Sequence, residues 1–437
     1  MFNDKFYEKL IALSYYIKGD KRFTYYKEYV SNLSKTKEEI KELQLNKLRK
    51  LIKHAYETTD YYKELFDKHK IKPDINSLND LKKIPELEKK TVLEDYKRLL
   101  SKKKYKLIKQ FSGGSTGNKV TIYKDKEYYE RCAAVWLRDL YSVGITPGMK
   151  SAWVWGNTSQ DLPLKKKFFE WLSFKINRRI MFNTFRYTDD DIERWLKKDF
   201  NRFKPDYMYG YAGIIYDIAK CIKNRNIKIH QLKKIITTSE RLEHRDFIES
   251  VFNCKVYDQY GCSEVNSVAI EDDNGIMHVS DDFVILELNK HNEILLTPLE
   301  CYGMPLLRYK VGDVGIIEKT DKKDKSPFGH FSLVVGRIYE ILLDKNGNKV
   351  SGGLIKQRVE DENLEINEFQ VVQKSYEEVD LNVVKDKFTK EEAVKRTAEI
   401  LKEELGCKKV NINYMDKYPA EPNGKRIAFK CLIKNNR

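Results

Sequence analysis

Residues 111–119 read Phe111-Ser112-Gly113-Gly114-Ser115-Thr116-Gly117-Asn118-Lys119, and the β-branched and aromatic run Val-Thr-Ile-Tyr follows at 120–123. The three glycines allow tight turns that present successive backbone N–H groups, and the hydroxyl side chains add further donors, which together suit a polyphosphate. The stretch is not a Walker A loop, because no Gly-Lys-Ser/Thr closes it and the residues after it look extended rather than helical. Taken alone, a Gly/Ser-rich stretch is more often a solvated hairpin turn. The rest of the chain therefore has to decide between a phosphate loop and a turn.

Length and composition indicate a soluble globular protein with two or more domains. The chain has 437 residues, of which 41% are hydrophobic, and no apolar run approaches the roughly 20 residues of a membrane span. The first residues lack the basic-then-apolar pattern of a signal peptide. We therefore expect a cytoplasmic enzyme.

The seven cysteines are scattered, odd in number and form no Cys-x-x-Cys pair, which favours a reducing compartment and argues against a structural zinc finger. Four residues could converge in space on a metal ion: Cys254, Cys262, His278 and Cys301. We favour the alternative that these cysteines are small buried hydrophobic residues.

The formal charge of +16 invites a nucleic-acid interpretation, but no helix-turn-helix, zinc-finger or aromatic RNA-binding signature accompanies it. Residues 1–110 carry 28 Lys and Arg against 17 Asp and Glu, which is +11 of the total. This basic region, rich in Tyr and Phe, is a candidate for peripheral contact with an anionic membrane. A solvated helical exterior explains the same charges more simply. We expect no nucleic-acid partner.

Strands and helices alternate after the glycine-rich stretch. Apolar residues at helical spacing predict helices over 2–67, and turn residues then separate strand-like runs from helical ones between 120 and 240. Such alternation predicts an α/β domain with a largely parallel sheet, in which ligands bind where strands end in loops. Three such ends are candidate pocket walls: Gly156-Asn157-Thr158 after Trp155, Tyr209-Gly210-Tyr211, and Thr238-Ser239-Glu240.

Four further clusters suggest a nucleotide site. In Tyr260-Gly261-Cys262-Ser263-Glu264 an aromatic strand runs into a glycine turn, so Tyr260 could stack on a base and Glu264 could hold Mg²⁺, although Glu264 could equally be a cap or a surface residue. Asp313 follows Gly312 after a strand, which suits bonds to ribose hydroxyls. Arg337 follows a glycine at an expected domain boundary, and Lys425 lies in a Pro/Gly-rich loop.

Together, in this order, these motifs resemble the adenylate-forming (ANL) superfamily, in its phenylacetate-CoA ligase branch with the CapK-type capsular polysaccharide biosynthesis proteins. The matching segments are the Ser/Thr/Gly-rich ATP loop at 112–117, Tyr-Gly-x-Ser-Glu at 260–264, Arg-Tyr-x-x-Gly-Asp at 308–313, the hinge at Gly336-Arg337, and the lysine loop at Asn423-Gly424-Lys425. Residues 51–66 also resemble an N-terminal helix of this branch. The resemblance thus covers nearly the whole chain.

The resemblance implies a large N-terminal α/β domain and a small C-terminal α+β domain. Residues 1–110 would be a helical part of the large domain, residues 111–335 its nucleotide- and acid-binding core, and residues 336–437 the mobile domain that carries the catalytic lysine. The implied activity is ATP-dependent adenylation of a carboxylic acid, followed by acyl transfer to a sugar, amine or thiol in surface polysaccharide biosynthesis. An aryl- or acyl-CoA ligase and a non-catalytic or membrane-associated scaffold remain alternatives.

The resemblance also implies a role for each motif. Lys425 and Glu264 would be catalytic, with Glu264 binding Mg²⁺. ATP would be held by Ser112 to Gly117, Ser239, Glu240, Tyr260, Gly261, Asp313 and Arg337, with coenzyme A as a further possible cofactor. The acid would lie against Trp155, Asn157, Tyr209 and Tyr211. Because polar residues follow the tryptophans at 157–160, we expect a polar, hydroxylated or amino-bearing acid.

Overall fold

The protein is described by a computed structural model, which places most of the chain. Described are residues 3–111, 121–156, 164–184, 187–316, 326–335, 341–347, 349–352, 355, 358–359, 362, 364, 366, 368–385, 389–416, 419 and 427–433. The predicted site residues Ser112 to Gly117, Asn157, Arg337 and Lys425 lie outside these ranges. The chain divides into two compact units, the first Met1–Val311 with Ile317–Ser332 and the second Gly312–Ile316 with Leu333–Arg437.

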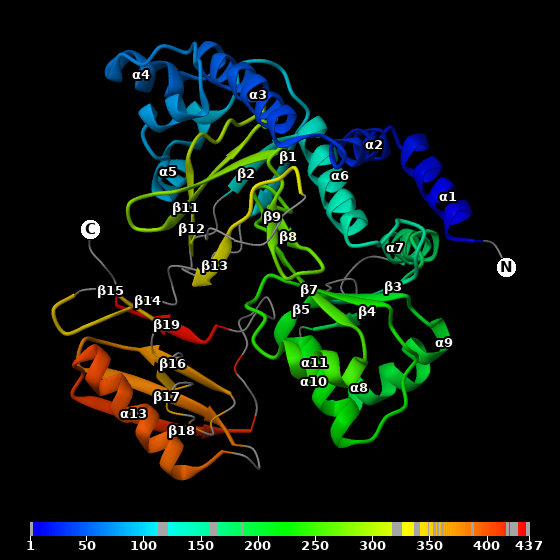
Figure 1. Ribbon diagram of the computed structural model, residues 1–437, viewed down its shortest axis with the longest axis vertical. Coiled ribbons are helices and arrows are strands. Elements are labelled where there is room, and N and C mark those ends of the chain that lie inside the picture. Colours follow the sequence, from blue (N-terminus) through cyan, green and yellow to red (C-terminus); the bar gives the residue numbers. More distant parts are fainter. Residues whose placement is uncertain are drawn as a thin grey trace. The chain divides into compact units, whose positions relative to one another are not determined.

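The first unit begins with helices that the sequence delimits clearly. Helix α3 (Lys37–Thr58) starts with a capping box, in which the Thr36 side chain accepts a bond from the Glu39 N–H and the Glu39 carboxylate accepts one from the Thr36 N–H. Its apolar stripe, which includes Leu48, Leu51 and Ile52, is buried. The neighbouring helices are α1 (Asp4–Ile17), α2 (Arg22–Asn32), α4 (Asp60–His69), the 3₁₀ helix η1 (Leu78–Lys83) and α5 (Lys89–Leu99) (Figure 1).

A seven-stranded sheet forms the centre of the first unit, in the order β4-β3-β5-β6-β7-β8-β9. Its parallel strands are β3 (Ser151–Trp155), β4 (Arg179–Asn183), β5 (Tyr207–Tyr211), β6 (Lys234–Thr238) and β7 (Lys255–Tyr260), and β8 (Ala269–Glu271) and β9 (Met277–Val279) continue it antiparallel. The connecting helices are α6 (Lys126–Ser142), α7 (Leu164–Ile176), α8 (Asp189–Trp195) with the π-helix η3 (Leu196–Phe200), α9 (Asn201–Phe203), α10 (Ala212–Asn224) and α11 (Arg245–Phe252). The predicted largely parallel α/β arrangement is confirmed.

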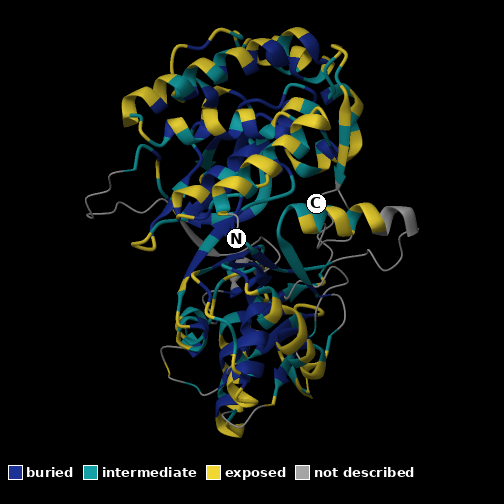
Figure 2. Ribbon diagram, turned by 90° about the vertical axis from the view of Figure 1, so that its right-hand side faces the viewer, coloured by how far each residue is buried: buried dark blue, intermediate teal, exposed yellow. Residues whose placement is uncertain are grey.

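The middle of this sheet is buried on both faces, as expected where helices cover a parallel sheet. Met208, Ile235 and Val256 lie on adjacent strands and are fully buried, and apolar residues of α10 such as Ile215 and Ile218 pack against them. The buried residues are drawn dark blue in Figure 2. The sheet is therefore a rigid frame that fixes the positions of the loops at its strand ends.

Further strands complete the first unit. A hairpin of β1 (Leu107–Phe111) and β2 (Thr121–Asp125) brackets the predicted phosphate loop, and its strands pair antiparallel. A four-stranded sheet has the order β10-β11-β12-β13, with β10 (Val284–Leu288), β11 (Glu293–Pro298), β12 (Tyr309–Ile316) and β13 (Ser332–Val335). Strands β12 and β13 contribute residues to both units.

The second unit is a small α+β domain. Its four-stranded sheet has the order β18-β17-β16-β19, formed by β16 (Phe369–Gln373), β17 (Glu378–Val384), β18 (Lys409–Met415) and β19 (Phe429–Cys431). Helix α13 (Glu391–Leu405) buries Val394 and Leu401 in the same core as Val371 and Leu381 of the sheet. A hairpin of β14 (Ile341–Leu343) and β15 (Lys349–Ser351) accompanies them. The predicted combination of a large α/β and a small α+β domain is confirmed.

Candidate nucleotide- and acid-binding site

The carboxyl ends of four parallel strands meet at one edge of the central sheet. In the register, Val154 of β3 pairs with Gly210 of β5, and Thr238 of β6 lies between Tyr211 of β5 and Gln259 of β7. The strand order therefore brings the predicted pocket walls from β3, β5 and β6 next to the Tyr260 motif. In open α/β sheets this edge is where ligands bind.

Aromatic side chains crowd the β3–β5 part of this edge. The ring centroids of Trp155 and Tyr211 are 4.4 Å apart with an interplanar angle of 28°, and those of Trp155 and Tyr209 are 6.1 Å apart at 24°. The backbones of β3 and β5 approach closely at Gly210, where a Cβ would lie 2.3 Å from the Val154 carbonyl oxygen. Glycine is therefore required at this position. Tyr209 and Tyr211 are buried and Trp155 is partly exposed. Three of the four predicted acid-binding residues thus lie together.

A chain of buried hydrogen bonds leads away from Tyr209. Its hydroxyl donates to the Gln259 side-chain oxygen at 2.9 Å, the Gln259 amide donates to Ser267 at 2.7 Å, and Ser267 donates to the Asp139 carboxylate at 2.5 Å. Burial raises the pKa of Tyr209 to about 12, so this hydroxyl stays protonated at neutral pH and remains a donor. The Tyr209 hydroxyl is therefore already engaged with Gln259, and its ring packs against Trp153 and Trp155.

The turn after β7 positions Glu264. Gly261 cannot be replaced without moving the backbone, because a Cβ there would lie 1.9 Å from the Asn266 carbonyl oxygen. The Asn266 N–H donates to the Cys262 carbonyl at 2.7 Å, and the Tyr128 hydroxyl donates to the Glu264 carbonyl at 2.9 Å. Glu264 is only 5% exposed. Carboxylate oxygens are ligands that Mg²⁺ accepts, so the position of Glu264 after this turn suits the predicted metal contact.

Tyr260 ends β7 just before this turn. It is buried, and its ring packs edge-on against Phe331 with centroids 5.5 Å apart. Ser239 follows β6 with a left-handed backbone (φ 69°), and the Glu240 carboxylate accepts a bond from the Gly213 N–H at the start of α10, at 2.8 Å. The structure thus gives Glu240 a helix-capping contact, while the predicted adenine contacts of Ser239, Glu240 and Tyr260 stay predictions.

Lys124 is a fully buried lysine that the sequence analysis did not single out. It lies on β2, directly after the predicted phosphate loop, and its ammonium donates to the Asn266 side chain at 3.0 Å and contacts Cys132 Sγ at 3.5 Å. It therefore ties the strand that follows the glycine-rich stretch to the turn that carries Glu264. Little in the sequence signals this contact, because Lys124 lies next to Asp125 in a lysine-rich chain.

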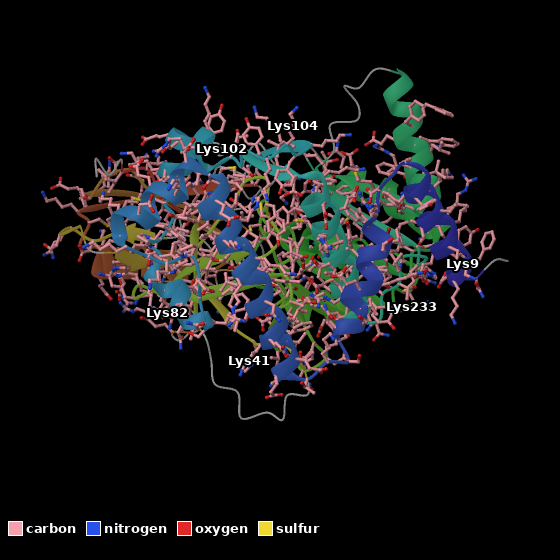
Figure 3. All side chains as sticks on the ribbon, turned by 90° about the horizontal axis from the view of Figure 1, so that it is seen from above. Lys9, Lys41, Lys82, Lys102, Lys104 and Lys233 are labelled. Carbon is pink, nitrogen blue, oxygen red and sulfur yellow. The ribbon has the colours of Figure 1, made fainter. Side chains whose placement is uncertain are left out.

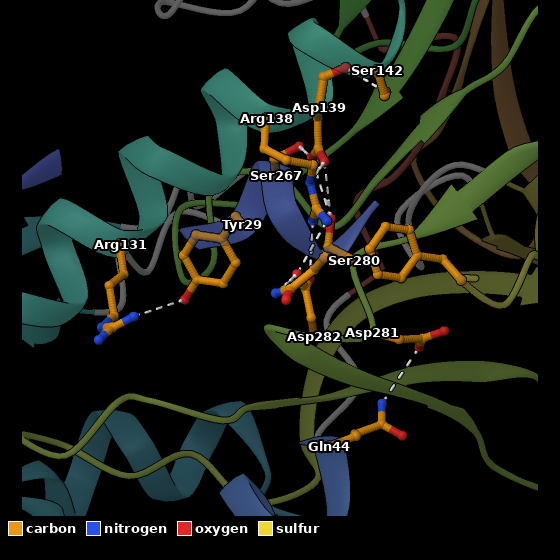
Figure 4. A network of polar contacts seen from close by, with 12 residues as sticks. Tyr29, Gln44, Arg131, Arg138, Asp139, Ser142, Ser267, Ser280, Asp281 and Asp282 are labelled. Atoms are coloured by element: carbon orange, nitrogen blue, oxygen red, sulfur yellow. Dashed lines mark hydrogen bonds and ion pairs between the residues drawn. The ribbon is translucent and has the colours of Figure 1, made fainter. Parts of the chain in front are cut away.

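A buried charge network lies at the other end of the hydrogen-bond chain (Figure 4). Arg138 donates from Nε to Asp139 at 2.7 Å and from both Nη atoms to the two Asp282 oxygens at 3.2 and 3.1 Å. Asn32 of α2 and Ser280 add bonds to Asp282 and Asp139. Burial lowers the pKa of Arg138, but Asp282 and Asp139 outweigh it and raise that pKa overall. The network fixes α2, α6 and the segments after β7 and β9 to one another.

The second unit contains Asp313, on β12. Asp313 is buried, and the preceding Gly312 has a positive φ of 91°, which favours glycine. The predicted bond between Asp313 and ribose stays a prediction, as do the roles of Ser112 to Gly117, Asn157, Arg337 and Lys425, which are outside the described residues.

The described residues contain no cluster of three or more His, Cys, Asp or Glu side chains able to hold a metal ion. Cys254, Cys262, His278 and Cys301 are all described, so their proposed convergence on a metal is wrong. Burial raises the pKa of Cys254 to about 12 and that of Cys301 well above its usual value. Cys301 is buried, in line with the favoured alternative, whereas Cys254 and Cys262 are only partly buried.

Comparisons with known proteins agree with this architecture. The profile of the CapK C-terminal domain family matches residues 342–436, most of the second unit. Protein CapK of Staphylococcus aureus is 25% identical over 420 residues, which cover 92% of this chain and 92% of that protein. The predicted CapK-type resemblance is confirmed.

Solved structures extend the CapK-type resemblance to the fold. The chain matches 2-hydroxyisobutyryl-CoA ligase in its postadenylation state, in complex with R3-HIB-AMP, with a TM-score of 0.67 and 16% identity, over 92% of this chain and 91% of that one. An open conformation of that ligase, in complex with 2-HIB-AMP and CoA, matches with a TM-score of 0.58 and 16% identity, over 90% and 91% of the two chains. The chain therefore has the fold of an adenylate-forming ligase.

Proposed function

We propose that this CapK-type protein is an ATP-dependent, AMP-forming ligase that adenylates a carboxylic acid and passes the acyl group to an acceptor in surface polysaccharide biosynthesis. The observation that carries the proposal is the position of Glu264, which is 5% exposed and follows the glycine turn at the carboxyl edge of the central sheet, in a chain with the fold of an adenylate-forming ligase. A carboxylate at this edge is suited to hold Mg²⁺ beside bound phosphates.

The charges of the two reactants define what the site has to do in this reaction. A carboxylate attacks the α-phosphorus of ATP, the bond to the leaving pyrophosphate breaks, and an acyl-adenylate forms. Both reactants are anionic, so the site has to neutralise charge and hold the two in line. Glu264 would hold Mg²⁺, which supplies positive charge at the phosphates. The amides and hydroxyls of Ser112 to Gly117 would bind the β- and γ-phosphates, and Lys425 would bridge the α-phosphate and the attacking carboxylate.

The remaining predicted residues would position the nucleotide and the acid. Asp313 would accept bonds from the ribose hydroxyls, with Arg337 beside the ribose or phosphate. Tyr260, Gly261, Ser239 and Glu240 would lie along the adenine. Trp155, Tyr209 and Tyr211 would form an aromatic wall, and Asn157 would add a polar group.

We further propose that the acid is small and polar. The rings of Trp155, Tyr209 and Tyr211 already stack on one another at 4.4 and 6.1 Å, which favours a flat wall over a deep aryl-sized slot. The ligase of similar fold was solved with the adenylate of a hydroxy acid, which makes a hydroxylated acid a reasonable first choice. An aryl- or acyl-CoA ligase of phenylacetate type is the second candidate.

The proposal is tested by measuring pyrophosphate release with a panel of hydroxy acids, amino acids, sugar acids, short fatty acids, benzoate and phenylacetate. Each acid is assayed with and without coenzyme A. We expect release that depends on ATP, Mg²⁺ and one polar acid. A coenzyme A requirement with preference for an unsubstituted aryl acid would favour the second candidate.

Two variants make the test specific. Lys425→Ala should abolish pyrophosphate release while ATP binding, measured by calorimetry, persists, because the lysine acts mainly in the transition state. Lys430→Ala, five residues further along on β19, is the matched control and should stay active. No release with any acid, together with normal ATP binding, would point instead to a non-catalytic scaffold that retains the fold.

A further inference from the structure

Two helices of the first unit, α1 and α7, present large apolar side chains to solvent. The described residues include 17 exposed large hydrophobic side chains, and nine of them lie on these two helices. They are Phe6, Leu10, Leu13, Tyr16 and Ile17 on α1, and Phe168, Phe169, Trp171 and Leu172 on α7. The helices contact one another, and Figures 1 and 3 both show them side by side. We call these nine residues the α1–α7 surface.

The face of α1 opposite its exposed residues is anchored to the first unit. Asp4 forms an ion pair with Arg178 at 2.7 Å, the Arg178 guanidinium lies 4.0 Å from the centre of the Tyr7 ring, and Ile11 is buried. The chain even requires a glycine at position 148, where a Cβ would lie 1.9 Å from the Asp4 carbonyl oxygen. The helix is thus fixed to the unit by one face.

The opposite face of α1 repeats apolar residues at helical spacing. Phe6, Leu10, Leu13 and Ile17 follow one another at intervals of four, three and four, so they form one stripe along the helix. Their exposed fractions are 42%, 42%, 53% and 75%. An ordinary surface helix would place charged residues on this stripe, so the pattern indicates a partner.

Basic residues flank the apolar stripe and indicate that the partner is negatively charged. Lys5, Lys9 and Lys18 of the α1 region are exposed, and Figure 3 labels Lys9 on α1. On α7, the exposed Lys175 has its Nζ 5.8 Å from the centre of the Trp171 ring. Residues 164–178 contain five basic residues and one acidic residue, and one of the five, Arg178, is paired with Asp4.

We propose that the α1–α7 surface binds the headgroup region of an anionic lipid bilayer. Helices that lie in a membrane interface combine an apolar face rich in Trp, Phe and Leu with flanking lysines. Among the described helices, none is both long enough and apolar enough to cross a bilayer, so the contact is peripheral. A second copy of the chain is a poorer occupant, because a symmetric contact would bring like-charged lysines together. The inference does not depend on adenylation.

From the sequence alone, the basic, Tyr- and Phe-rich residues 1–110 are a candidate for membrane contact, and a solvated helical exterior is the simpler explanation. In the structure, α1 is the helix of that region with a stripe of exposed apolar residues, and α7, which lies outside the region, completes the exposed apolar surface. Helix α3, with many lysines, buries its apolar stripe and offers no apolar face to a membrane. The membrane contact is therefore defined by exposed apolar area next to positive charge, rather than by charge alone.

The test is co-sedimentation of the full chain with sucrose-loaded vesicles of phosphatidylglycerol and phosphatidylcholine, and with vesicles of phosphatidylcholine only. We expect binding to the anionic vesicles that weakens as salt rises. The double variant Leu13→Glu/Phe168→Glu should lose about tenfold or more in vesicle affinity, because it places carboxylates in the apolar face. The matched control Leu93→Glu, at an exposed leucine of α5, should bind like the unmodified protein.

Folding of each variant is checked by circular dichroism, and self-association by sedimentation velocity without lipid. Equal binding of all variants would overturn the proposal, as would absence of binding to anionic vesicles. A dimer that forms without lipid and is lost in the double variant would assign the surface to a second copy and overturn the proposal too. A blue shift of the fluorescence on vesicle binding that is lost in Trp171→Phe would support it, because Trp171 is 54% exposed in the free protein.

Discussion

The two units each contain a network of arginines and carboxylates, but water is excluded from only one of them. In the first unit, Arg138, Asp139 and Asp282 have side chains that are 1%, 4% and 0% exposed. In the second unit, Arg396 of α13 binds Glu362 at 2.7 Å and Glu403 at 2.8 Å, and all three side chains are 31% exposed or more. The contact distances in the two networks are similar, so the networks differ mainly in how far their charges are exposed to solvent.

That difference decides what each network does. Removing one partner of a buried ion pair leaves an uncompensated charge away from water, whereas an exposed pair exchanges its partner for water and salt. The buried network also continues through Ser267 and Gln259 to Tyr209, so it joins the helical layer to the candidate site. The exposed network lies on the surface of α13 and joins it to Glu362. We therefore expect substitutions in the buried network to reduce stability and disturb the candidate site. Substitutions in the exposed network should do neither.

The largest effect is expected for Asp282→Ala. The variant leaves the Arg138 guanidinium with Asp139 alone in a buried site, which should lower the free energy of unfolding by about 3–5 kcal/mol. All five tryptophans lie in the first unit, so urea unfolding followed by tryptophan fluorescence reports on this unit selectively. Glu362→Ala in the second unit is the matched control and should leave this transition unchanged. Equal shifts for the two variants would contradict the comparison.

A smaller, pH-dependent effect is expected at Asp281, next to this network. Burial raises the pKa of Asp281 to about 6, above the value of about 3.9 for an unfolded aspartate, so the folded state holds this proton more tightly. Its contribution to stability is present below pH 4 and is lost as the pH rises through 6. Asp281→Asn removes the titration but keeps an acceptor for the Gly329 N–H.

The stability of the unmodified protein relative to Asp281→Asn should therefore fall by about 2 kcal/mol between pH 4.5 and pH 7.5. Urea unfolding curves at several pH values measure it, again by tryptophan fluorescence. A constant difference across this range would show that Asp281 does not titrate there.

Ser267→Ala sharpens the comparison without removing a charge. The variant deletes the donor to Asp139 and the acceptor for Gln259, so it should cost about 1–2 kcal/mol. Because Gln259 then loses a fixed partner, the KM for the acid should rise more than kcat falls. Ser250→Ala, at an exposed serine of α11, is the control. Unchanged kinetics together with the expected loss of stability would show that the buried network stabilises the fold but does not affect binding of the acid.

The smallest effect is expected for Arg396→Ala. The hydrogen bonds that Arg396 donates to Glu362 raise the pKa of this arginine, but its charge is accessible to solvent and salt. The thermal unfolding of the second unit, followed by far-UV circular dichroism and limited proteolysis, should stay nearly unchanged, and added salt should abolish any residual shift. A loss comparable to that of Asp282→Ala would mean that exposure does not separate the two networks.

Local chemistry determined much of this protein from its sequence. Helix α3 is set by the Thr36 and Glu39 capping box and by its apolar spacing, and the turn at Gly261 and the alternating strands and helices are equally local in origin. Such features depend on residues a few positions apart, so periodicity and turn chemistry predict them. The resemblance of the motifs to those of the adenylate-forming superfamily then implied the ligase fold.

Only the tertiary structure decided which distant residues meet and which faces stay uncovered. Arg138 and Asp282 are 144 positions apart, and nothing in their neighbouring residues marks one as the partner of the other. Likewise, the apolar spacing of α3 and of α1 looks alike in the sequence, although α3 buries its stripe and α1 leaves Leu13 and Ile17 in water. The physical reason is that burial and pairing depend on the register of the sheet and on the packing of whole helices, which no local pattern contains.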